Sequence, residues 1–373
     1  MPIEIREVKS KRELNQFIKL PFELYKNNPY WVPPIIMEEK MTFTKGKNPA
    51  LDFCDLKLFL AFKNNKAVGR IAAIINHKAN EVWNGKHARF GWIDFIDDIE
   101  VSSALFEAAE LFAKEKGMEA IHGPLGFTDF DKEGMLIFGF NELGTTATIY
   151  NHPYYQNHTE SAGYIKDADW VEFEIKADIT LPEKHARIAE LVKQRNGLKL
   201  LNAKSKKELI PYIPQIFELI NESYREIYGF VPATPEQIKY YTKLYFGFVN
   251  PEFVPVVLNS ENKVVGVGIT MPNVSKALQK AKGKLFPFGF IYLLRALKKM
   301  DTVDFYLTAI KPELQNKGIN ALLFTQLIPV YNKYKILKAE TNIELEENHK
   351  IQNMWEDFEK RNHKRRRAYI KHF

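Results

Sequence analysis

Short, mainly apolar stretches occur in two pairs, the first of them alternating over residues 56–62, and each pair predicts a β-hairpin. Residues 56–62 and 67–75 are separated by the polar turn of residues 63–66. Residues 254–258 and 264–271 flank a similar polar turn. Two alternating runs joined by a short Asn- and Lys-rich turn are typical of antiparallel strands. The chain therefore contains two hairpins, one in each half.

Helical spacing follows each hairpin. Apolar residues recur three and four positions apart over residues 102–116, where Gly117 ends the pattern. In the second half, a buried strand over residues 302–310 precedes an apolar helical pattern that begins near residue 321. Strands that alternate with helices in this way favour an α/β fold.

The two halves also repeat in sequence. Val68-Gly69 corresponds to Val265-Gly266 in the hairpins, and Asn151-His152 corresponds to Asn348-His349, both 197 residues further along. A constant offset indicates an internal duplication. We expect one unit over residues 1–180 and a second over residues 181–373.

Composition restricts the class of protein. The 373 residues are 45% hydrophobic and 27% charged, as in globular proteins, and the net charge of +7 suits an anionic ligand. The single cysteine, Cys54, excludes an internal disulfide and suggests a reducing compartment. The chain shows neither a signal peptide nor a run of eighteen apolar residues, so we expect a cytoplasmic protein. The nine histidines lack metal-ligand spacing, so no metal is expected.

A turn between the strand at 302–310 and the following helix has the features of an anion site. Free backbone N–H groups and the helix dipole attract negative charge at a helix N-terminus. Gly318 permits a close backbone approach, and Lys317 adds positive charge. The candidate phosphate-binding residues are Gln315, Asn316, Lys317, Gly318, Ile319, Asn320 and Ala321. The alternative is an ordinary strand-to-helix turn.

The segment Gln315-x-x-Gly318-x-Asn320-Ala321 resembles the acyl-CoA pyrophosphate loop of the GNAT acyltransferase superfamily. The superfamily pattern is Gln/Arg-x-x-Gly-x-Gly/Ala, so Asn320 departs from it. The order of predicted elements in each half resembles the same fold. The resemblance implies an α/β protein of two tandem GNAT-like units, each a twisted mixed β-sheet flanked by helices.

The first unit lacks this loop. Residues 96–100 stand in its place and carry three carboxylates, which would repel a pyrophosphate. We interpret the first unit as degenerate and the second as the unit with the acyl-CoA site. The spacing of residues 30–34, 68–74 and 151–155 also resembles an uncharacterised bacterial group of tandem GNAT-like proteins.

The resemblance implies an acyl-CoA-dependent N-acyltransferase, with acyl-CoA as cosubstrate. Backbone donors from Thr308, Ala309 and Ile310 would polarise the thioester. Trp355 stands where a phenol is expected as general acid, and an indole cannot serve as that acid. The base candidates Glu344, Glu346 and Glu347 also fit a solvated acidic run. The general acid and base therefore stay unknown, and the alternative function is a non-catalytic acyl-CoA or small-molecule binding protein of duplicated GNAT fold.

The acceptor is expected to be a small-molecule or peptide amine. Polar and aromatic residues that could line its pocket are Tyr154, Tyr155, Tyr224, Tyr228 and Asn348, although the same residues could serve only in packing.

Two further segments admit alternatives. Residues 285–300, inserted before the strand at 302–310, have an apolar body with basic residues at one end. They could form a lid over an acyl chain, a membrane-surface helix or a core-packing helix. The basic residues 363–367 could contact nucleic acid, but they are more typical of a charged edge strand.

Overall fold

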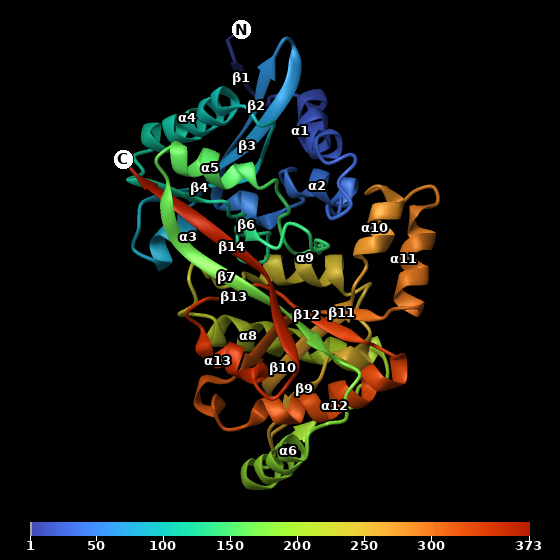
Figure 1. Ribbon diagram of the computed structural model, residues 1–373. Helices are drawn as coiled ribbons and strands as arrows, with labels where there is room; N and C mark the ends of the chain where they lie inside the picture. The colour runs from blue at the N-terminus through green and yellow to red at the C-terminus, as the bar shows by residue number, and fades with distance from the viewer. Residues whose placement is uncertain (1) are drawn as a thin grey trace. The chain divides into compact units, whose positions relative to one another are not determined.

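The computed structural model describes residues 2–373 and divides into two compact units (Figure 1). Unit 1 comprises the chain up to Val171 together with Val274–Leu293 and His363–Phe373. Unit 2 comprises Glu172–Asn273 and Leu294–Asn362. These units are defined by which residues contact one another in space, whereas the predicted boundary at residue 180 divides the sequence into two repeats. That boundary therefore stays a prediction.

Unit 1 is a sheet with helices on both faces. Its elements are β1 (Glu4–Glu7), α1 (Lys11–Leu24), α2 (Ile36–Thr42), β2 (Cys54–Lys63), β3 (Lys66–Asn76), α3 (His77–Val82), β4 (His87–Phe95), α4 (Ile99–Glu115), β5 (Ala120–Gly123), β6 (Met135–Phe138), α5 (Tyr154–Ser161) and the start of β7 (Ile165–Lys176). The strand order is β1-β2-β3-β4-β5. Neighbours are antiparallel except for the parallel pair β4–β5.

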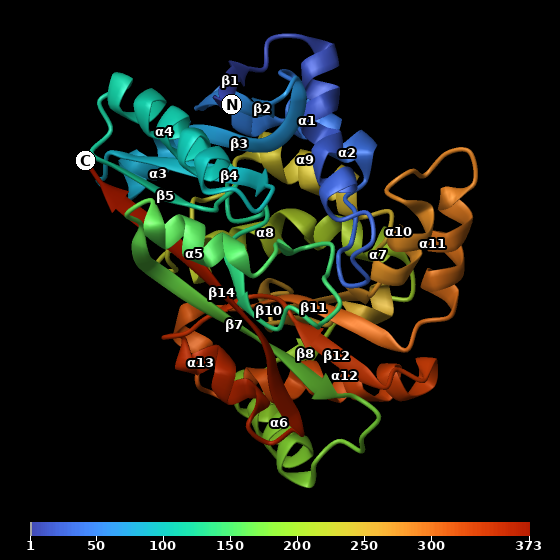
Figure 2. The ribbon, with the colours of Figure 1, turned by 45° about the horizontal axis from the view of Figure 1, so that its top comes forward.

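The predicted hairpin β2–β3 is confirmed, and its alternation separates two cores. Phe59 and Ala61 pack on the side of α4, whereas Leu58 and Leu60 pack on the side of α1. Successive side chains of a strand point to opposite faces, so one apolar strand can serve both helices. Figure 2 shows α4 and α1 on either side of this sheet.

Unit 2 repeats the arrangement. Its elements are the end of β7, α6 (Glu183–Asn196), β8 (Lys199–Leu200), α7 (Lys206–Leu209), α8 (Ile213–Ser223), α9 (Pro235–Tyr245), β9 (Val256–Leu258), β10 (Val264–Pro272), the end of α11 (Gly289–Lys298), β11 (Thr302–Ile310), α12 (Ile319–Tyr334), β12 (Lys338–Thr341), β13 (Glu344–Leu345), α13 (His349–Gln352) and the start of β14 (Lys360–His372). The strand order is β8-β9-β10-β11-β12, and only β11–β12 is parallel. α10 (Ser275–Ala281) lies in unit 1.

The closing strands are exchanged between the repeats. In unit 1, β5 pairs with the C-terminal part of β14, where Tyr369 lies opposite Gly123. In unit 2, β12 pairs with the end of β7, where Lys338 lies opposite Lys176. The last strand of each sequence repeat therefore completes the sheet of the other unit.

The interpretation of the basic segment 363–367 as an edge strand is wrong. β14 lies between β5 and β7 in the strand order, so it is an interior strand. Asp169 in β7 accepts hydrogen bonds from Arg367 Nε at 2.7 Å and Arg365 Nε at 3.0 Å. Arg366 is buried and donates to the carbonyl of Ile149. The segment is held by a carboxylate and a carbonyl of unit 1, and its side chains do not form a free basic patch.

Among the helices of residues 2–373, none combines the length and apolar character needed to span a bilayer.

Candidate functional site

An opening in the sheet of unit 2 forms where β11 and β12 part. Their parallel pairing ends at Phe305, opposite Thr341, and the last backbone link is Asn342 N–H to the Phe305 carbonyl at 3.0 Å. At about the same level, the pairing of β11 with β10 shifts by one residue between Ile269 and Thr270. A bulge of this kind bends a strand, and residues 306–310 continue without β12 beside them.

The hydrogen-bond pattern shows which backbone groups of β11 face this opening. Lys311 N–H donates to the Val265 carbonyl at 2.9 Å, and Gly268 N–H points away from β11 to the Pro255 carbonyl at 3.0 Å. In an antiparallel pair these bonds place the N–H and C=O groups of Thr308 and Ile310 on the side away from β10.

The carbonyls of these two residues are occupied by side chains from the end of α8. The Tyr224 hydroxyl donates to the Thr308 carbonyl at 3.0 Å, and the Ser223 hydroxyl donates to the Ile310 carbonyl at 2.9 Å. Within residues 2–373, the N–H groups of Thr308 and Ile310 have no hydrogen-bond acceptor. Of the three predicted backbone donors, these two are available, whereas Ala309 directs its N–H toward β10.

The predicted phosphate loop lies at the start of α12. Gly318 is the N-cap residue with φ of 80°, and no side chain caps the helix. The N–H groups of Gly318, Ile319 and Asn320 have no acceptor in the described part of the chain. Asn316 and Lys317 are exposed beside them, while Gln315 donates to the Ile310 carbonyl at 3.2 Å. The loop therefore presents free donors and a positive side chain at a helix N-terminus.

Gly318 is required by packing as well as by its backbone angle. A Cβ atom at this position would lie 2.5 Å from Cγ2 of Ile188 in α6. A bulky residue at 318 would displace α6 with or without a ligand. Substitution of Gly318 therefore cannot test ligand binding.

Two buried polar atoms close to these backbone donors lack partners. Thr308 Oγ1 on β11 and Asn320 Oδ1 in the first turn of α12 form no hydrogen bond within residues 2–373. Buried polar atoms in native proteins are nearly always paired. An amide or hydroxyl group of a ligand could donate to Asn320 Oδ1, and the Thr308 hydroxyl could donate to a carbonyl or phosphate oxygen, so the residues present fit a CoA-like cosubstrate.

Among the three predicted base candidates, the structure distinguishes Glu344. It is 8% exposed, and burial raises the pKa of its carboxyl group to about 7. Its Oε1 accepts from the Trp355 indole N–H at 2.8 Å, and its Oε2 has no partner in the described chain. Glu346 is half-buried and Glu347 is exposed. Trp355, which replaces the expected phenol, thus orients the carboxylate.

Glu344 also acts electrostatically on Tyr224. Burial is the main cause of the raised pKa of the Tyr224 hydroxyl, and the charge of Glu344 raises it further. The carboxylate therefore lies within electrostatic reach of the hydroxyl that contacts the opening. A buried carboxyl group with a pKa near neutrality and a free oxygen can take up and release a proton.

The equivalent opening in unit 1 is filled. Ile96 N–H donates to the Val68 carbonyl at 3.0 Å, just as Lys311 does to Val265, so Phe95 corresponds to Ile310. The Phe95 N–H donates to the Tyr155 hydroxyl at 2.8 Å. The Tyr154 hydroxyl donates to the Phe95 carbonyl at 2.6 Å. Tyrosine side chains thus hold the backbone groups that are partly free in unit 2.

The helix start of unit 1 is also occupied. Asp98 caps α4 by accepting from the Glu100 N–H at 3.1 Å, and its other oxygen contacts Lys63 Nζ at 2.6 Å. A carboxylate already uses the helix dipole there. Both differences favour the interpretation of unit 1 as degenerate for CoA.

The predicted acceptor residues fall into both units. Tyr155 is fully buried in unit 1, and Tyr154 lies beside it. Tyr224 contacts the opening of unit 2, Tyr228 is half-buried four residues later, and the Asn348 side chain caps α13 by accepting from Ile351 N–H at 3.4 Å. An acceptor role for these five residues stays a prediction.

The sequence analysis missed that a tyrosine after one helix in each unit donates a hydrogen bond to a group on a strand of the sheet. Tyr25 follows α1 and donates to Asp94 Oδ1 at 2.8 Å, whereas Tyr224 follows α8 and donates to the Thr308 carbonyl. Both tyrosines precede a Val-Pro pair, Val32-Pro33 and Val231-Pro232. This repeated spacing was a signal for the site.

Replacing Tyr155 by phenylalanine is expected to lower the free energy of unfolding by about 1–3 kcal/mol. The substitution leaves the Phe95 N–H buried without its acceptor, and Tyr25 loses its 3.0 Å hydrogen bond. Urea unfolding measures the effect. Tyr30→Phe is the matched control, and CoA binding should be unchanged in both variants. A stable Tyr155→Phe protein with weakened CoA binding would place the site in unit 1.

Comparison with known proteins identifies the family of the chain. No family model matches the chain. Protein YghO of Escherichia coli (strain K12) is 29% identical over 384 residues, which cover 98% of this chain and 95% of YghO. A bacterial ceramide synthase of Caulobacter vibrioides (strain NA1000 / CB15N) is 30% identical over 302 residues, which cover 79% of this chain and 77% of the synthase. The chain belongs to the family of this bacterial ceramide synthase.

Solved structures confirm the fold of the chain. A tandem GNAT protein from the clavulanic acid biosynthesis pathway aligns over 99% of the chain and 98% of its own length, with a TM-score of 0.57 and 12% identity. A GCN5-related N-acetyltransferase from Sphaerobacter thermophilus aligns over 99% and 95%, with a TM-score of 0.52 and 10% identity. The predicted α/β fold of tandem GNAT-like units is therefore correct, although identities this low show the fold alone. Within residues 2–373 of this family member, no group of three or more His, Cys, Asp or Glu side chains could hold a metal ion.

Proposed function

We propose that this protein transfers an acyl group from acyl-CoA to a primary amine at the opening of unit 2. The observation that carries the proposal is the pair of free N–H groups on β11, at Thr308 and Ile310, with a buried carboxylate of raised pKa in electrostatic reach. The corresponding backbone groups of unit 1 are occupied by tyrosines.

The cosubstrate would be held by backbone donors along its length. The pyrophosphate fits the uncapped N-terminus of α12, where Lys317 adds positive charge. The thioester carbonyl would accept from the N–H of Thr308 or Ile310, and this bond strengthens as negative charge develops on the oxygen. Asn320, where the superfamily pattern has Gly or Ala, supplies a buried Oδ1 atom that can accept from the cosubstrate.

Glu344 would carry the proton. The neutral amine nitrogen attacks the thioester carbon, a C–N bond forms and the C–S bond breaks. Glu344 takes one proton from the attacking nitrogen and returns it to the departing sulfur, which leaves as the CoA thiol. A carboxyl pKa of about 7 lies between those of an ordinary carboxylate and a thiol, so one residue can perform both transfers. The tryptophan in place of a phenol is then compatible with turnover.

For the acceptor we propose a long-chain amino alcohol. The Caulobacter relative is a ceramide synthase, and a ceramide is an amide of such an amino alcohol with a fatty acid. The amine of this class has the nucleophilic nitrogen that the reaction needs.

The test combines binding and turnover. Calorimetry should detect binding of acyl-CoAs of two to eighteen carbons, and a thiol reagent should detect CoA release only when a long-chain amino alcohol is added. Binding of acyl-CoA without thiol release from any amine would favour the alternative, a non-catalytic binding protein. Absence of acyl-CoA binding would contradict both functions.

A further inference from the structure

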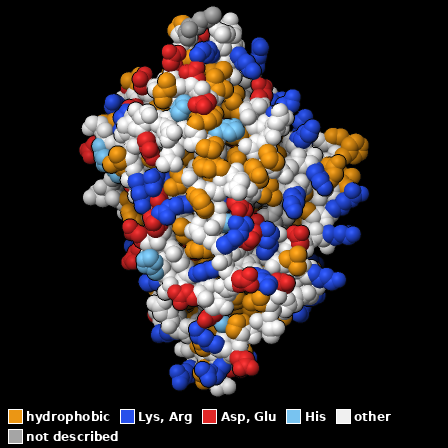
Figure 3. Space-filling model, in the orientation of Figure 1, with side chains coloured by type: hydrophobic (Ala, Val, Ile, Leu, Met, Phe, Trp, Pro, Cys, Tyr) orange, Lys and Arg blue, Asp and Glu red, His pale blue; other side chains and the backbone are white. Residues whose placement is uncertain are grey.

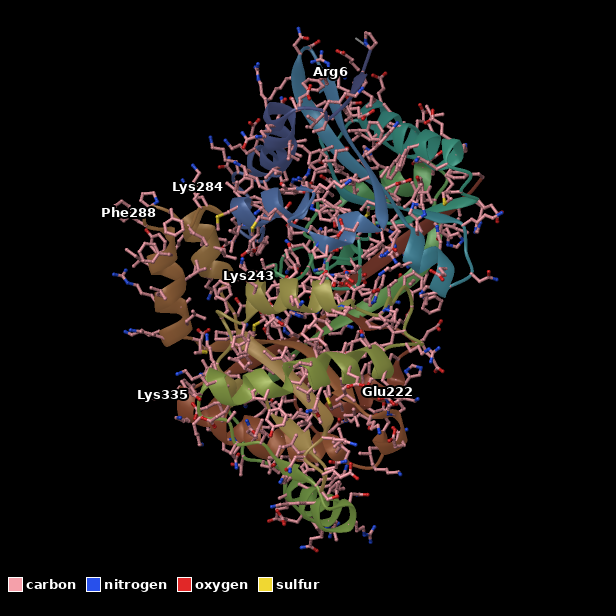
Figure 4. The ribbon with its side chains drawn as sticks, turned by 180° about the vertical axis from the view of Figure 1, so that it is seen from behind. Arg6, Glu222, Lys243, Lys284, Phe288 and Lys335 are labelled. Carbon is pink, nitrogen blue, oxygen red and sulfur yellow. The ribbon has the colours of Figure 1, made fainter. Side chains whose placement is uncertain are left out.

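The segment between β10 and β11 forms a hairpin of two helices with an apolar end. α10 and α11 are joined by residues 282–288, and we call residues 284–294 the hairpin tip. Within it, Phe286 is 71% exposed and Phe288 is 70% exposed. Figure 4 shows Phe288 and Lys284 at the end of the two helices, and Phe288 points away from the ribbon. The core-packing alternative is therefore wrong for Phe286 and Phe288, whereas Leu293 of the same segment is buried, and the two exposed rings cover no pocket.

The base of the hairpin is firmly attached within unit 1. The Gln279 side chain donates to the carbonyls of Pro29 and Trp31 at 2.8 and 2.9 Å. The Gly283 carbonyl accepts from Ile36 N–H at 3.0 Å. A Cβ atom at Gly283 would lie 2.3 Å from the Pro34 carbonyl oxygen. The tip is therefore presented by a fixed support, and its exposure does not come from a loose segment.

The exposed apolar side chains form one group. The aromatic rings of Phe286 and Phe290 have centroids 6.0 Å apart. Leu294, one turn beyond Phe290 on the same face of α11, is 53% exposed. Single exposed apolar residues are normal, but a contiguous group indicates an interaction surface. Figure 3 shows hydrophobic side chains together with Lys and Arg over the α10–α11 hairpin.

The charged side chains of the hairpin segment itself have one sign. Residues 274–300 contain no Asp or Glu. The basic residues of this segment are Lys276, Lys280, Lys282, Lys284, Arg295, Lys298 and Lys299. All seven are exposed, and within residues 2–373 none of them has an ion pair. Their charge is available to an anionic partner.

We propose that the hairpin tip docks this protein on the surface of an anionic phospholipid bilayer. Phenylalanines at a turn can enter the boundary between headgroups and acyl chains while surrounding lysines contact lipid phosphates. A second copy of the chain is a poor occupant because two tips of the same charge repel. The inference does not rest on the proposed acyl transfer, since it uses no residue of the unit 2 opening.

Vesicle co-sedimentation tests the proposal. The full chain should sediment with vesicles of phosphatidylethanolamine and phosphatidylglycerol but weakly with pure phosphatidylcholine, and added salt should release it. F286S/F288S should lower vesicle binding about tenfold or more. K280Q/K284Q should lower binding to anionic vesicles about 25-fold, since each of the two lysines near the surface contributes about fivefold. Leu111→Ser, at another exposed apolar side chain of unit 1, is the matched control and should bind as wild type.

Each alternative outcome overturns the proposal. Wild-type protein that does not bind anionic vesicles, or F286S/F288S protein that binds them equally, would exclude the tip as a lipid-docking element. Analytical ultracentrifugation of the same variants covers a second copy of the chain: loss of a dimer without any vesicle binding would assign the tip to self-association. Single-stranded RNA could also displace the wild type from vesicles. If F286S/F288S then fails to bind RNA, the hairpin tip would be assigned to nucleic-acid binding.

Discussion

Replacing Glu344 by glutamine is expected to lower kcat for acyl transfer by about 10²–10⁴-fold, the range for loss of a general base. The amide keeps an oxygen that can accept from Trp355 at the position of Oε1, but it cannot take a proton. The wild-type rate should rise with pH through about 7, where the buried carboxyl group ionises. The variant should lack this rise.

The control is Glu347→Gln, which removes an exposed carboxylate three residues away. It should keep both the rate and the pH profile of the wild type. Binding of acyl-CoA should be nearly unchanged in both variants, because the carboxylate acts on the amine. A Glu344→Gln enzyme with an unaltered pH profile would exclude Glu344 as the base.

Glu344→Gln is also expected to stabilise the protein at alkaline pH. The pKa of Glu344 is raised from 4.5 in the unfolded chain to about 7 in the fold, so folding favours the protonated form. Stability from this group is therefore complete below about pH 4.5, falls as the pH rises to about 7, and stays reduced above it. The cost at pH 8 is up to about 3 kcal/mol, because a tenfold change in proton affinity equals about 1.36 kcal/mol. Urea unfolding at pH 8 should show Glu344→Gln to be more stable than wild type although less active.

Reversing the charge of Lys317 is expected to weaken CoA binding about 30-fold or more. In Lys317→Glu, a carboxylate replaces the ammonium group beside the free N–H groups of α12, where the pyrophosphate is proposed to bind. Two opposite charges near a protein surface interact by about 1–4 kcal/mol at 4 Å, so a reversal of about 2 kcal/mol is a moderate expectation. Calorimetry with CoA at low and high salt measures the loss, and salt should reduce the difference.

The matched control is Lys335→Glu at the opposite end of the same helix (Figure 4). Lys335 is exposed, and the 16 residues of α12 between it and Lys317 span about 24 Å at a rise of about 1.5 Å per residue. This variant has the same net charge as Lys317→Glu but should bind CoA like wild type. Equal losses in the two variants would mean that only the overall charge matters, and the loop would not be the pyrophosphate site.

Local patterns predicted the repeated fold because the hairpins and helices are encoded by nearby residues. β2, β3 and β10 are mainly apolar runs bounded by polar turns, and the helix after Gly318 begins where the turn residues end. The position of β14 could not be predicted in this way, since its basic residues are equally compatible with an edge strand. In its interior position between β5 and β7, its arginines pair with Asp169, which lies about 200 residues away in sequence. Long-range ion pairs leave no local signal.

Sequence patterns also located part of the candidate site, namely its strand and its loop, but they did not identify its buried carboxylate. The strand at 302–310 and the loop at 315–321 follow from sequence, because they combine a motif with a strand-to-helix turn. The sequence could not separate Glu344 from Glu346 and Glu347, since the three differ in burial, which is set by the fold around them. At the tip of the α10–α11 hairpin, the fold exposes residues whose composition suggests burial. Phe286 and Phe288 have core composition but lie at a turn that the fold leaves uncovered.

The exchanged closing strands make each repeat structurally dependent on the other. Without β14 the sheet of unit 1 would expose the free edge of β5, and without β7 the sheet of unit 2 would expose the free edge of β12. A gene that lost the first repeat would thus lose the strand that completes the unit with the open site. The first repeat, whose own opening is filled by tyrosines, can therefore be conserved for the strand that it supplies, independently of any ligand of its own.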